Sequence, residues 1–341
     1  MLQTDWFERL FGFREVGYDK TRRQLGLDGR QLRSRVNGRT YGIGELELVS
    51  LGSLRERVRI AGMPAGRLSV RIVTGDVRAM HALPEYAGAL FQVASQFNLL
   101  EMTAPEVSPE HGVTRYRCDG TQGPACAMAA GAATVYRNYF APVAGGSGQT
   151  SERQLDGLAD LGAAFGASLG VPVNTLWTMR NGYALCTQAG LEAISGHLAS
   201  LGPAQIDALR GLLRIGCHRD VEVTDALAAP PPIVSQAFCS ALPVAYSRVP
   251  PAFWAPFATL ILEAAYEATL LAAMASAQCG GSNVVLLTRL GGGAFGNDAG
   301  WIDAAMTRAL RLAAAFDLDV RLVSYGLPTP ALQALAADFS Q

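Results

Sequence analysis

The chain has 341 residues, of which 50% are hydrophobic and 17% are charged, a balance typical of a globular protein with a large core. Its 28 Lys and Arg residues against 29 Asp and Glu residues give a formal net charge of −1. A charge this close to zero provides no electrostatic footprint for nucleic acid or for an anionic membrane, so neither is expected as a partner.

The N-terminal segment and the cysteines indicate a cytoplasmic protein. The first twenty residues mix acids with aromatics and lack the basic and apolar regions of a signal peptide, which leaves open export as an effector without a cleavable signal. The six cysteines occur singly, with no CxxC pair and no His at metal-ligand spacing. We therefore expect reduced thiols, no disulfide framework, no metal and no cofactor.

Residues 1–50 are rich in Arg and Gly and show little periodicity until an extended apolar/polar alternation begins near residue 44. Apolar strands are expected at 68–73 and 88–98. We expect residues 1–55 to form an N-terminal extension that packs on a single domain of residues 56–341.

Helices and strands then alternate along the chain. Asn181 and Gly182 predict a hairpin turn between two short strands. The proline-rich stretch 227–254 is expected to be mainly loop and extended chain inside the domain. The spacing predicts helices over residues 123–140, 158–170, 190–201, 203–216, 252–277 and 301–316, and strands near 283–288 and 319–325. Within the long helix, Glu263 and Glu267 favour a core helix over a membrane span. The alternation predicts an α/β sandwich with partly parallel strands.

Several strands are followed by ligand-type residues. Asp76 follows one strand, and Gln96, Asn98 and Glu101 follow the next. A strand that served only as core would end in turn residues, so these amides and acids indicate a ligand site at the strand ends.

Two glycine-containing turns each precede a helix. The first is "DGTQGPACA", and the second is "LGGGAFGND" near the C-terminus. Glycines let the backbone approach a ligand, and free N–H groups before a helix bind anions such as a diphosphate. The second turn is neither a Walker A loop nor a Rossmann fingerprint, and a tight turn without a ligand is the alternative.

Taken in order, "TGDV", "VASQFN", "DGTQGPACA" and "LGGGAFGN" resemble the ADP-ribose-binding macrodomain family over roughly residues 68–325. The resemblance implies a macrodomain-like three-layer α/β/α sandwich with a mixed sheet. It also implies a site in which Asp76 holds the adenine and the two turns clasp the diphosphate and the distal ribose. The implied ligand-binding residues are Asp76, Gln96, Thr121, Gln122, Gly123, Gly291, Gly292, Gly293, Ala294, Phe295, Gly296 and Asn297.

The first turn departs from the family pattern because Thr121-Gln122-Gly123-Pro124 stands where a run of glycines is usual. Carboxylates lie nearby, as in a divergent branch that includes hydrolases of ADP-ribosylated arginine, some of which act on ubiquitin. Cleavage of a glycosidic bond needs groups that position water and transfer protons. We assign Asp119 as the main acid/base or water-positioning group, Glu101 as the second, and Asn98 as the contact to the ribose hydroxyls. The alternative for Asp119 is a turn-forming or helix-capping role.

The predicted function is hydrolysis of mono-ADP-ribose from protein side chains, with arginine as the preferred linkage and ubiquitin as one conceivable target. The partners are thus ADP-ribose or an ADP-ribosylated protein. Three alternatives remain open: a reader module that binds ADP-ribose without turnover, a hydrolase of a free nucleotide sugar or of poly(ADP-ribose), and a structural α/β protein.

Overall fold

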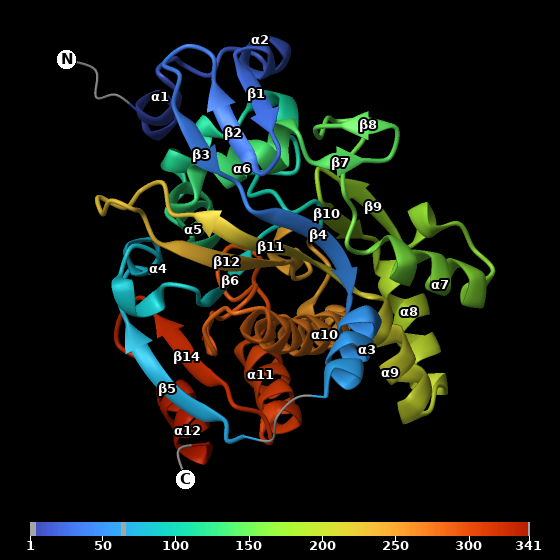
Figure 1. Cartoon of the computed structure of the whole chain (residues 1–341). Coiled ribbons are helices and arrows are strands. Elements are labelled where there is room, and N and C mark those ends of the chain that lie inside the picture. The colour runs from blue at the N-terminus through green and yellow to red at the C-terminus, as the bar shows by residue number, and fades with distance from the viewer. Residues whose placement is uncertain (1–4, 63–65, 340–341) are drawn as a thin grey trace.

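A seven-stranded mixed sheet forms the centre of the computed structural model, which describes residues 5–62 and 66–339 (Figure 1). The strand order is β4-β11-β12-β6-β13-β14-β5. The strands are β4 (Glu45–Ser50), β5 (Ser69–Thr74), β6 (Leu90–Ala94), β11 (Arg214–Glu222), β12 (Ile233–Cys239), β13 (Val284–Leu287) and β14 (Asp319–Ser324). The five strands from β12 to β5 pair in parallel, whereas β11 is antiparallel to both of its neighbours.

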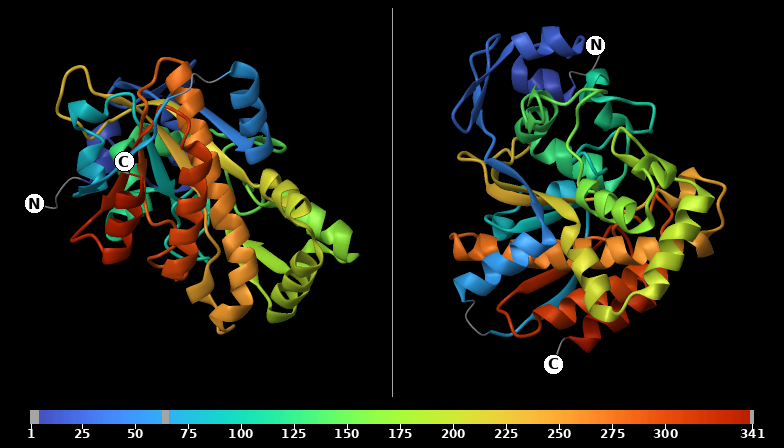
Figure 2. Two further views of the ribbon diagram at one scale, coloured as in Figure 1. Left: turned by 90° about the horizontal axis from the view of Figure 1, so that it is seen from below. Right: turned by 90° about the vertical axis from the view of Figure 1, so that its right-hand side faces the viewer.

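Helices cover both faces of this sheet, which confirms the predicted α/β sandwich with a mixed sheet (Figures 1 and 2). One face carries α3 (Leu51–Ala61), α10 (Pro251–Gln278), α11 (Ala299–Ala313) and α12 (Pro330–Asp338). The other carries α4 (Val77–Met80), α5 (Gln122–Ala129) and α6 (Gly131–Tyr139).

The central strand β6 has buried side chains on both faces of the sheet. All four residues from Leu90 to Val93 are buried, as is typical of parallel strands. Leu90 belongs to the core cluster around α10, whereas Phe91 and Val93 belong to the cluster around α5. The polar Gln92 is satisfied because its amide donates to Thr269 of α10 at 3.0 Å.

The long helix α10 lies at the centre of its layer. It passes a test of length and hydropathy for a membrane span, but 83% of its most apolar window is buried inside the molecule. Glu267 on this helix accepts hydrogen bonds from Arg55 of α3 at 2.6 Å and Arg308 of α11 at 2.6 Å. These ion pairs and the burial favour a core helix.

A lateral group of short elements flanks the sheet (Figure 1). It comprises α7 (Ala159–Leu169), α8 (Gln188–Ser200), α9 (Pro203–Leu212) and the hairpins β7 (Pro142–Val143)–β8 (Gly146–Ser147) and β9 (Trp177–Arg180)–β10 (Tyr183–Cys186). The 3-10 turns of the chain are η1 (Pro84–Tyr86), η2 (Pro109–His111), η3 (Thr114–Cys118), η4 (Val173–Thr175) and η5 (Val244–Tyr246). The hairpin predicted at Asn181 and Gly182 is confirmed, since both residues have positive φ and join β9 to β10.

The structure adds detail to three expectations about the chain. The N-terminal segment is ordered as α1 (Trp6–Phe11), α2 (Tyr18–Arg23) and a sheet of β1 (Leu25–Asp28), β2 (Gln31–Ser34) and β3 (Thr40–Gly42). The extended alternation ends at Ser50, whose side chain caps α3, and the expected boundary at residue 55 falls inside that helix. The proline-rich stretch contains β12, a buried central strand, because residues 233–239 hold no proline.

Candidate active site

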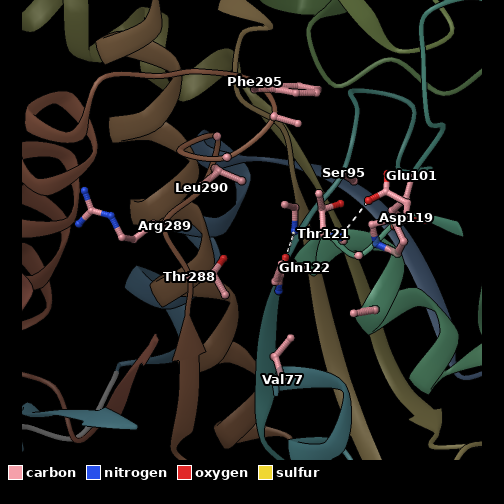
Figure 3. Close-up of a pocket in the computed structure, with 18 of the residues that line it drawn as sticks. Val77, Ser95, Glu101, Asp119, Thr121, Gln122, Thr288, Arg289, Leu290 and Phe295 are labelled. Atoms are coloured by element: carbon pink, nitrogen blue, oxygen red, sulfur yellow. Dashed lines mark hydrogen bonds between the residues drawn. The ribbon is translucent and has the colours of Figure 1, made fainter. Parts of the chain in front are cut away.

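An elongated cavity of about 380 Å³ lies at the carboxyl ends of the parallel strands (Figure 3). Such a volume falls within the range of small-molecule sites, roughly 300–1,000 Å³. The cavity follows the strand order from β5 and β14 through β13 to β6, and neighbouring strands lie about 4.8 Å apart. Its two ends are therefore built from different strands and can hold different parts of one ligand.

The turn that follows β6 is built by its own amide side chains. Gln96 accepts a hydrogen bond from Met102 N at 2.7 Å and donates to Met102 O at 3.2 Å. Asn98 accepts from Leu100 N at 3.1 Å and donates to Gln154 at 2.8 Å. Gln96 still lines the cavity, but Asn98 is fully buried outside its lining. The expected contact of Asn98 with ribose hydroxyls is incompatible with this placement, because its amide is occupied by the turn.

Two tyrosines complete the support of this turn. The hydroxyl of Tyr116, from η3, accepts the backbone N–H of Glu101 at 3.0 Å. The hydroxyl of Tyr183, from β10, donates to Met102 O at 2.6 Å. Glu101 is thus held on a turn whose backbone is fixed on both sides.

Glu101 lines the cavity while only 2% of the residue is exposed. Its Oε1 lies 3.4 Å from Nη2 of Arg137, and its Oε2 has no partner in the described part of the chain. Burial raises the pKa of Glu101 to about 7, and the opposing charge of Arg137 lowers it less than burial raises it. A carboxyl group with a free oxygen and a pKa near neutrality can accept or donate a proton at physiological pH.

Asp119 lines the same part of the cavity but is half-buried. Its Oδ1 accepts a hydrogen bond from Thr121 N at 2.8 Å, so it also forms the turn that the alternative interpretation predicted. Glu101 and Asp119 both line the cavity, and Figure 3 shows both on its right-hand side. The structure thus brings the two predicted carboxylates together and makes Glu101 the more buried of them.

The segment after Asp119 lines the cavity and contains unpaired backbone N–H groups. Among hydrogen bonds of the described residues, the N–H groups of Gly120, Gln122 and Gly123 have no acceptor. A Cβ at Gly123 would lie 2.0 Å from Ala94 O, so only glycine allows this approach. The Gln122 side chain bonds Ala94 N and Gln92 O, both at 2.8 Å, and thereby attaches the N-terminus of α5 to β6. Its role is to hold this helix end beside the strand, where the free N–H groups favour an anion.

The glycine-rich turn of residues 290–297 faces this helix end across the cavity. The N–H groups of Gly293, Ala294 and Phe295 have no acceptor within residues 5–62 and 66–339. Asn297 instead donates its amide to Leu242 O at 2.8 Å and its backbone N–H to Gly291 O. Successive unpaired N–H groups form a concavity that binds anions.

Three of the predicted loop residues do not line the cavity, namely Gly292, Gly296 and Asn297. Gly292 and Gly296 donate their N–H groups to turn carbonyls, and Asn297 fastens the turn. These residues shape the loop, and the lining is left to Gly291, Gly293, Ala294 and Phe295.

Aromatic rings line the end of the cavity that contains Glu101 and Asp119, which is called the acidic end below. The ring of Phe295 lies 5.3 Å from that of Tyr183 and 5.6 Å from that of Tyr246, centroid to centroid. Sequence reasoning identified Phe295 but missed both tyrosines, which come from the hairpin and from η5. The hairpin signal at Asn181 and Gly182 could have marked Tyr183 as the residue just past a tight turn.

The opposite end of the cavity lies where β5 and β14 end. Asp76 lines it, and its side chain caps α4 by accepting from Arg78 N at 2.9 Å. Val323 and Ser324 line it from β14, and Tyr325 follows with 84% of its surface exposed. An exposed aromatic ring next to apolar side chains suits a planar base. Sequence reasoning did not single out Tyr325.

Comparisons of sequence find no match for this chain, whereas comparisons of structure find similar proteins. No family model matches the sequence, and no curated protein matches it. Poly(ADP-ribose) glycohydrolase from Thermomonospora curvata is similar in structure, with 15% identity, 93% of each chain covered and a TM-score of 0.43. The enzyme of that name from Deinococcus radiodurans in complex with ADP-ribose shows 14% identity, covers 86% of this chain and 91% of its own, and has a TM-score of 0.42.

Proposed function

We propose that this cavity binds ADP-ribose and that the chain hydrolyses the bond between the distal ribose and a protein side chain, with arginine as the preferred linkage. The observation that carries the proposal is the order of chemistry along one cavity. The end with Asp76, Val323 and Tyr325 is followed by two groups of free N–H donors and then by two carboxylates beside aromatic rings. A base, a diphosphate and a ribose occur in this order in ADP-ribose.

Val323, Tyr325 and Asp76 would hold the adenine at the β5/β14 end. The N–H groups around Gly123 and Ala294 would hold the diphosphate, because two donor-rich turns on opposite sides can share its charge. The distal ribose would then reach the acidic end, with Phe295 against one side of the sugar.

Glu101 would act as the general base. Water adds through its oxygen to C1 of the ribose while the C1–N bond breaks and its electron pair stays on the leaving nitrogen. The carboxylate of Glu101 takes the proton from the water, and that proton ends on the neutral guanidine that leaves. Asp119 would lie beside the leaving group, where a carboxylate stabilises the cationic guanidinium of the substrate and of the product.

Arginine is preferred as the linkage because the acidic end matches a cation. An ester-linked substrate carries no positive charge at this position, so one of the two carboxylates would have no counterpart. The cavity selects the ADP-ribosyl group and its linkage. A panel of ADP-ribosylated proteins that includes ubiquitin would identify the target protein.

The test measures release of ADP-ribose from arginine-ADP-ribosylated protein, from carboxylate-linked protein and from poly(ADP-ribose), alongside calorimetric titration with free ADP-ribose. We expect wild type to release ADP-ribose from the arginine linkage. Glu101→Gln should bind ADP-ribose within threefold of wild type and lose at least a hundredfold in kcat. Asp119→Asn should lose about tenfold, and Glu192→Gln, an exposed change on α8, should match wild type.

Binding without release from any of the three substrates would make the chain a reader of ADP-ribose. Release from poly(ADP-ribose) alone would contradict the arginine preference. If no binding occurs, the cavity is assigned to the wrong ligand.

A further inference from the structure

One charged side chain close to Glu101 lies outside the cavity. Arg137 of α6 is fully buried, with 0% of its side chain exposed. It does not line the cavity, and sequence reasoning did not select it. Burial of a guanidinium is costly, and apolar replacements of buried ion pairs are often neutral or stabilising. Its presence behind the cavity wall therefore calls for a role other than stability.

Two of the contacts of Arg137 reach the turn that carries Glu101, and the others hold its guanidinium in place. Its Nε donates to Leu99 O at 3.1 Å, and its Nη2 donates to Glu101 Oε1 at 3.4 Å. Nη2 also donates to Thr134 at 3.1 Å, and the guanidinium carbon lies 3.8 Å from the centroid of the Phe238 ring. These contacts fix the guanidinium plane, so the position of Oε1 is fixed as well.

Leu99 shows that the turn needs this support. It has a φ of 65°, in the left-handed region that non-glycine residues avoid. Its side chain is buried, and a Cβ at Gly216 of β11 would lie 2.5 Å from Leu99 Cδ1. The unfavourable backbone persists because packing on one side and the Arg137 bond to its carbonyl on the other determine it.

We propose that Arg137 is the positioning residue of the proposed hydrolase: it binds Oε1 of Glu101 from behind the cavity wall and leaves Oε2 free to take the proton of the attacking water. This inference rests on the proposed function. Consistent with it, Oε2 of Glu101 is buried and has no hydrogen-bond partner among the described residues, so a water bound against it would satisfy this oxygen.

Three buried titratable groups beside the pair stay neutral near pH 7, so Arg137 is the cation that acts on Glu101, and Asp119 is the carboxylate that shares its end of the cavity. Burial raises the pKa of Tyr116 on η3 and of Cys126 on α5 well above their usual ranges. Burial together with the Arg137 charge holds the pKa of His218 on β11 well below its usual range. Removal of Arg137 would therefore leave Glu101 without its nearby positive charge and disfavour the carboxylate.

The experiment compares Arg137→Met and Arg137→Lys with wild type in single-turnover hydrolysis across pH 5–9 and in ADP-ribose titration. For Arg137→Met we expect kcat to fall 30-fold or more at pH 7, with the acidic limb of the pH profile moved upward by at least one pH unit. The Kd for ADP-ribose should stay within threefold, since Arg137 lies outside the lining. Arg22→Met is the matched control, because Arg22 packs over Phe140 and bonds Ser147 without touching a carboxylate.

Arg137→Met leaves a buried carboxylate without its cation, so a second pair of variants guards against loss of folding. Arg137→Lys keeps a cation but loses the planar arrangement of N–H donors of a guanidinium. We therefore expect kcat to fall at least threefold while the acidic limb of the pH profile stays in place. In thermal unfolding, Glu101→Gln/Arg137→Met should melt higher than Arg137→Met alone.

A wild-type kcat and an unmoved acidic limb in both Arg137 variants would overturn the positioning role even if the protein is a hydrolase. If wild type itself shows no hydrolysis, the proposed function has failed, and the thermal-unfolding cycle still reports whether Arg137 and Glu101 are coupled.

Discussion

Glu101 illustrates how one side chain acquires chemistry from its surroundings. In solution a glutamate is ionised well below neutral pH. Here burial raises its pKa to about 7, while Arg137 supplies the nearby charge that opposes the rise. Asp119 lies in the same end of the cavity but is half-exposed and keeps a turn together. Two carboxylates with different environments can thus take different roles.

The pH dependence of activity follows from this shift. Since a general base acts in its deprotonated form, kcat should rise with pH, about tenfold per unit below pH 7, and level off above it. The sign would be opposite if Glu101 acted as the general acid, with activity lost above pH 7. A pH profile of kcat distinguishes the two, and a profile that is flat between pH 5 and 8 would exclude Glu101 as the titrating group.

At the level of elements, the β9–β10 hairpin supports the Glu101 turn from the outside. Gly182 has a φ of 80° and accepts the backbone N–H of Phe97 at 3.0 Å. A Cβ at Gly182 would lie 2.6 Å from Asn98 Cγ and 2.6 Å from Gln96 Cβ. The hairpin and the turn can therefore lie together only with glycine at this position.

The change Gly182→Ala should lower the free energy of unfolding by roughly 2–4 kcal/mol, because it combines positive φ with steric overlap. Hydrolysis should fall as well, since the Glu101 turn would have to move. Gly196→Ala on α8 is the matched control: a Cβ there meets nothing within 4 Å, and alanine should stabilise the helix by up to about 1 kcal/mol. Denaturant unfolding measures both, and equal stabilities would contradict the steric argument.

At the level of the whole molecule, the N-terminal segment is connected to the candidate active site through Glu15. Its carboxylate accepts from Val113 N at 2.9 Å and Thr114 N at 2.7 Å, at the start of η3. It also accepts from the hydroxyl of Tyr139 at 2.7 Å. Since η3 carries Tyr116 and leads into Asp119, the N-terminal elements fix one wall of the cavity.

The change Glu15→Ala should therefore reduce both stability and hydrolysis. The loss of three hydrogen bonds to a charged acceptor should cost roughly 2–4 kcal/mol. Glu8→Ala is the comparison, because Glu8 forms an exposed pair with Arg14 that contributes at most about 1 kcal/mol. Thermal unfolding and the hydrolysis assay measure the two effects. If Glu15→Ala and Glu8→Ala behave alike, η3 does not depend on the N-terminal segment.

Much of the fold could be predicted from local patterns. The strands at β5, β6, β13 and β14 and the helices from α7 to α11 follow runs of apolar residues and their spacing. The segment before residue 44 could not be predicted in this way, because its elements have six residues or fewer. Such short elements are fixed by packing, as with the aromatic cluster of Trp6, Phe7 and Phe11 against α6 and η3.

The sequence by itself determined which residues could meet at the strand ends, because parallel strands bring their carboxyl ends to one edge of the sheet. Asp76, Gln96, Glu101, Asp119 and the two glycine turns were therefore identifiable in order. Only the tertiary structure decided what each of them does. It places Asn98 and Gln122 in hydrogen bonds that hold loops, and it brings Arg137 and Tyr183, from distant positions, to the Glu101 turn. The physical reason is that the burial and the hydrogen-bond partners of a carboxylate depend on residues far along the chain. Burial and partners together set both the geometry and the pKa of that carboxylate.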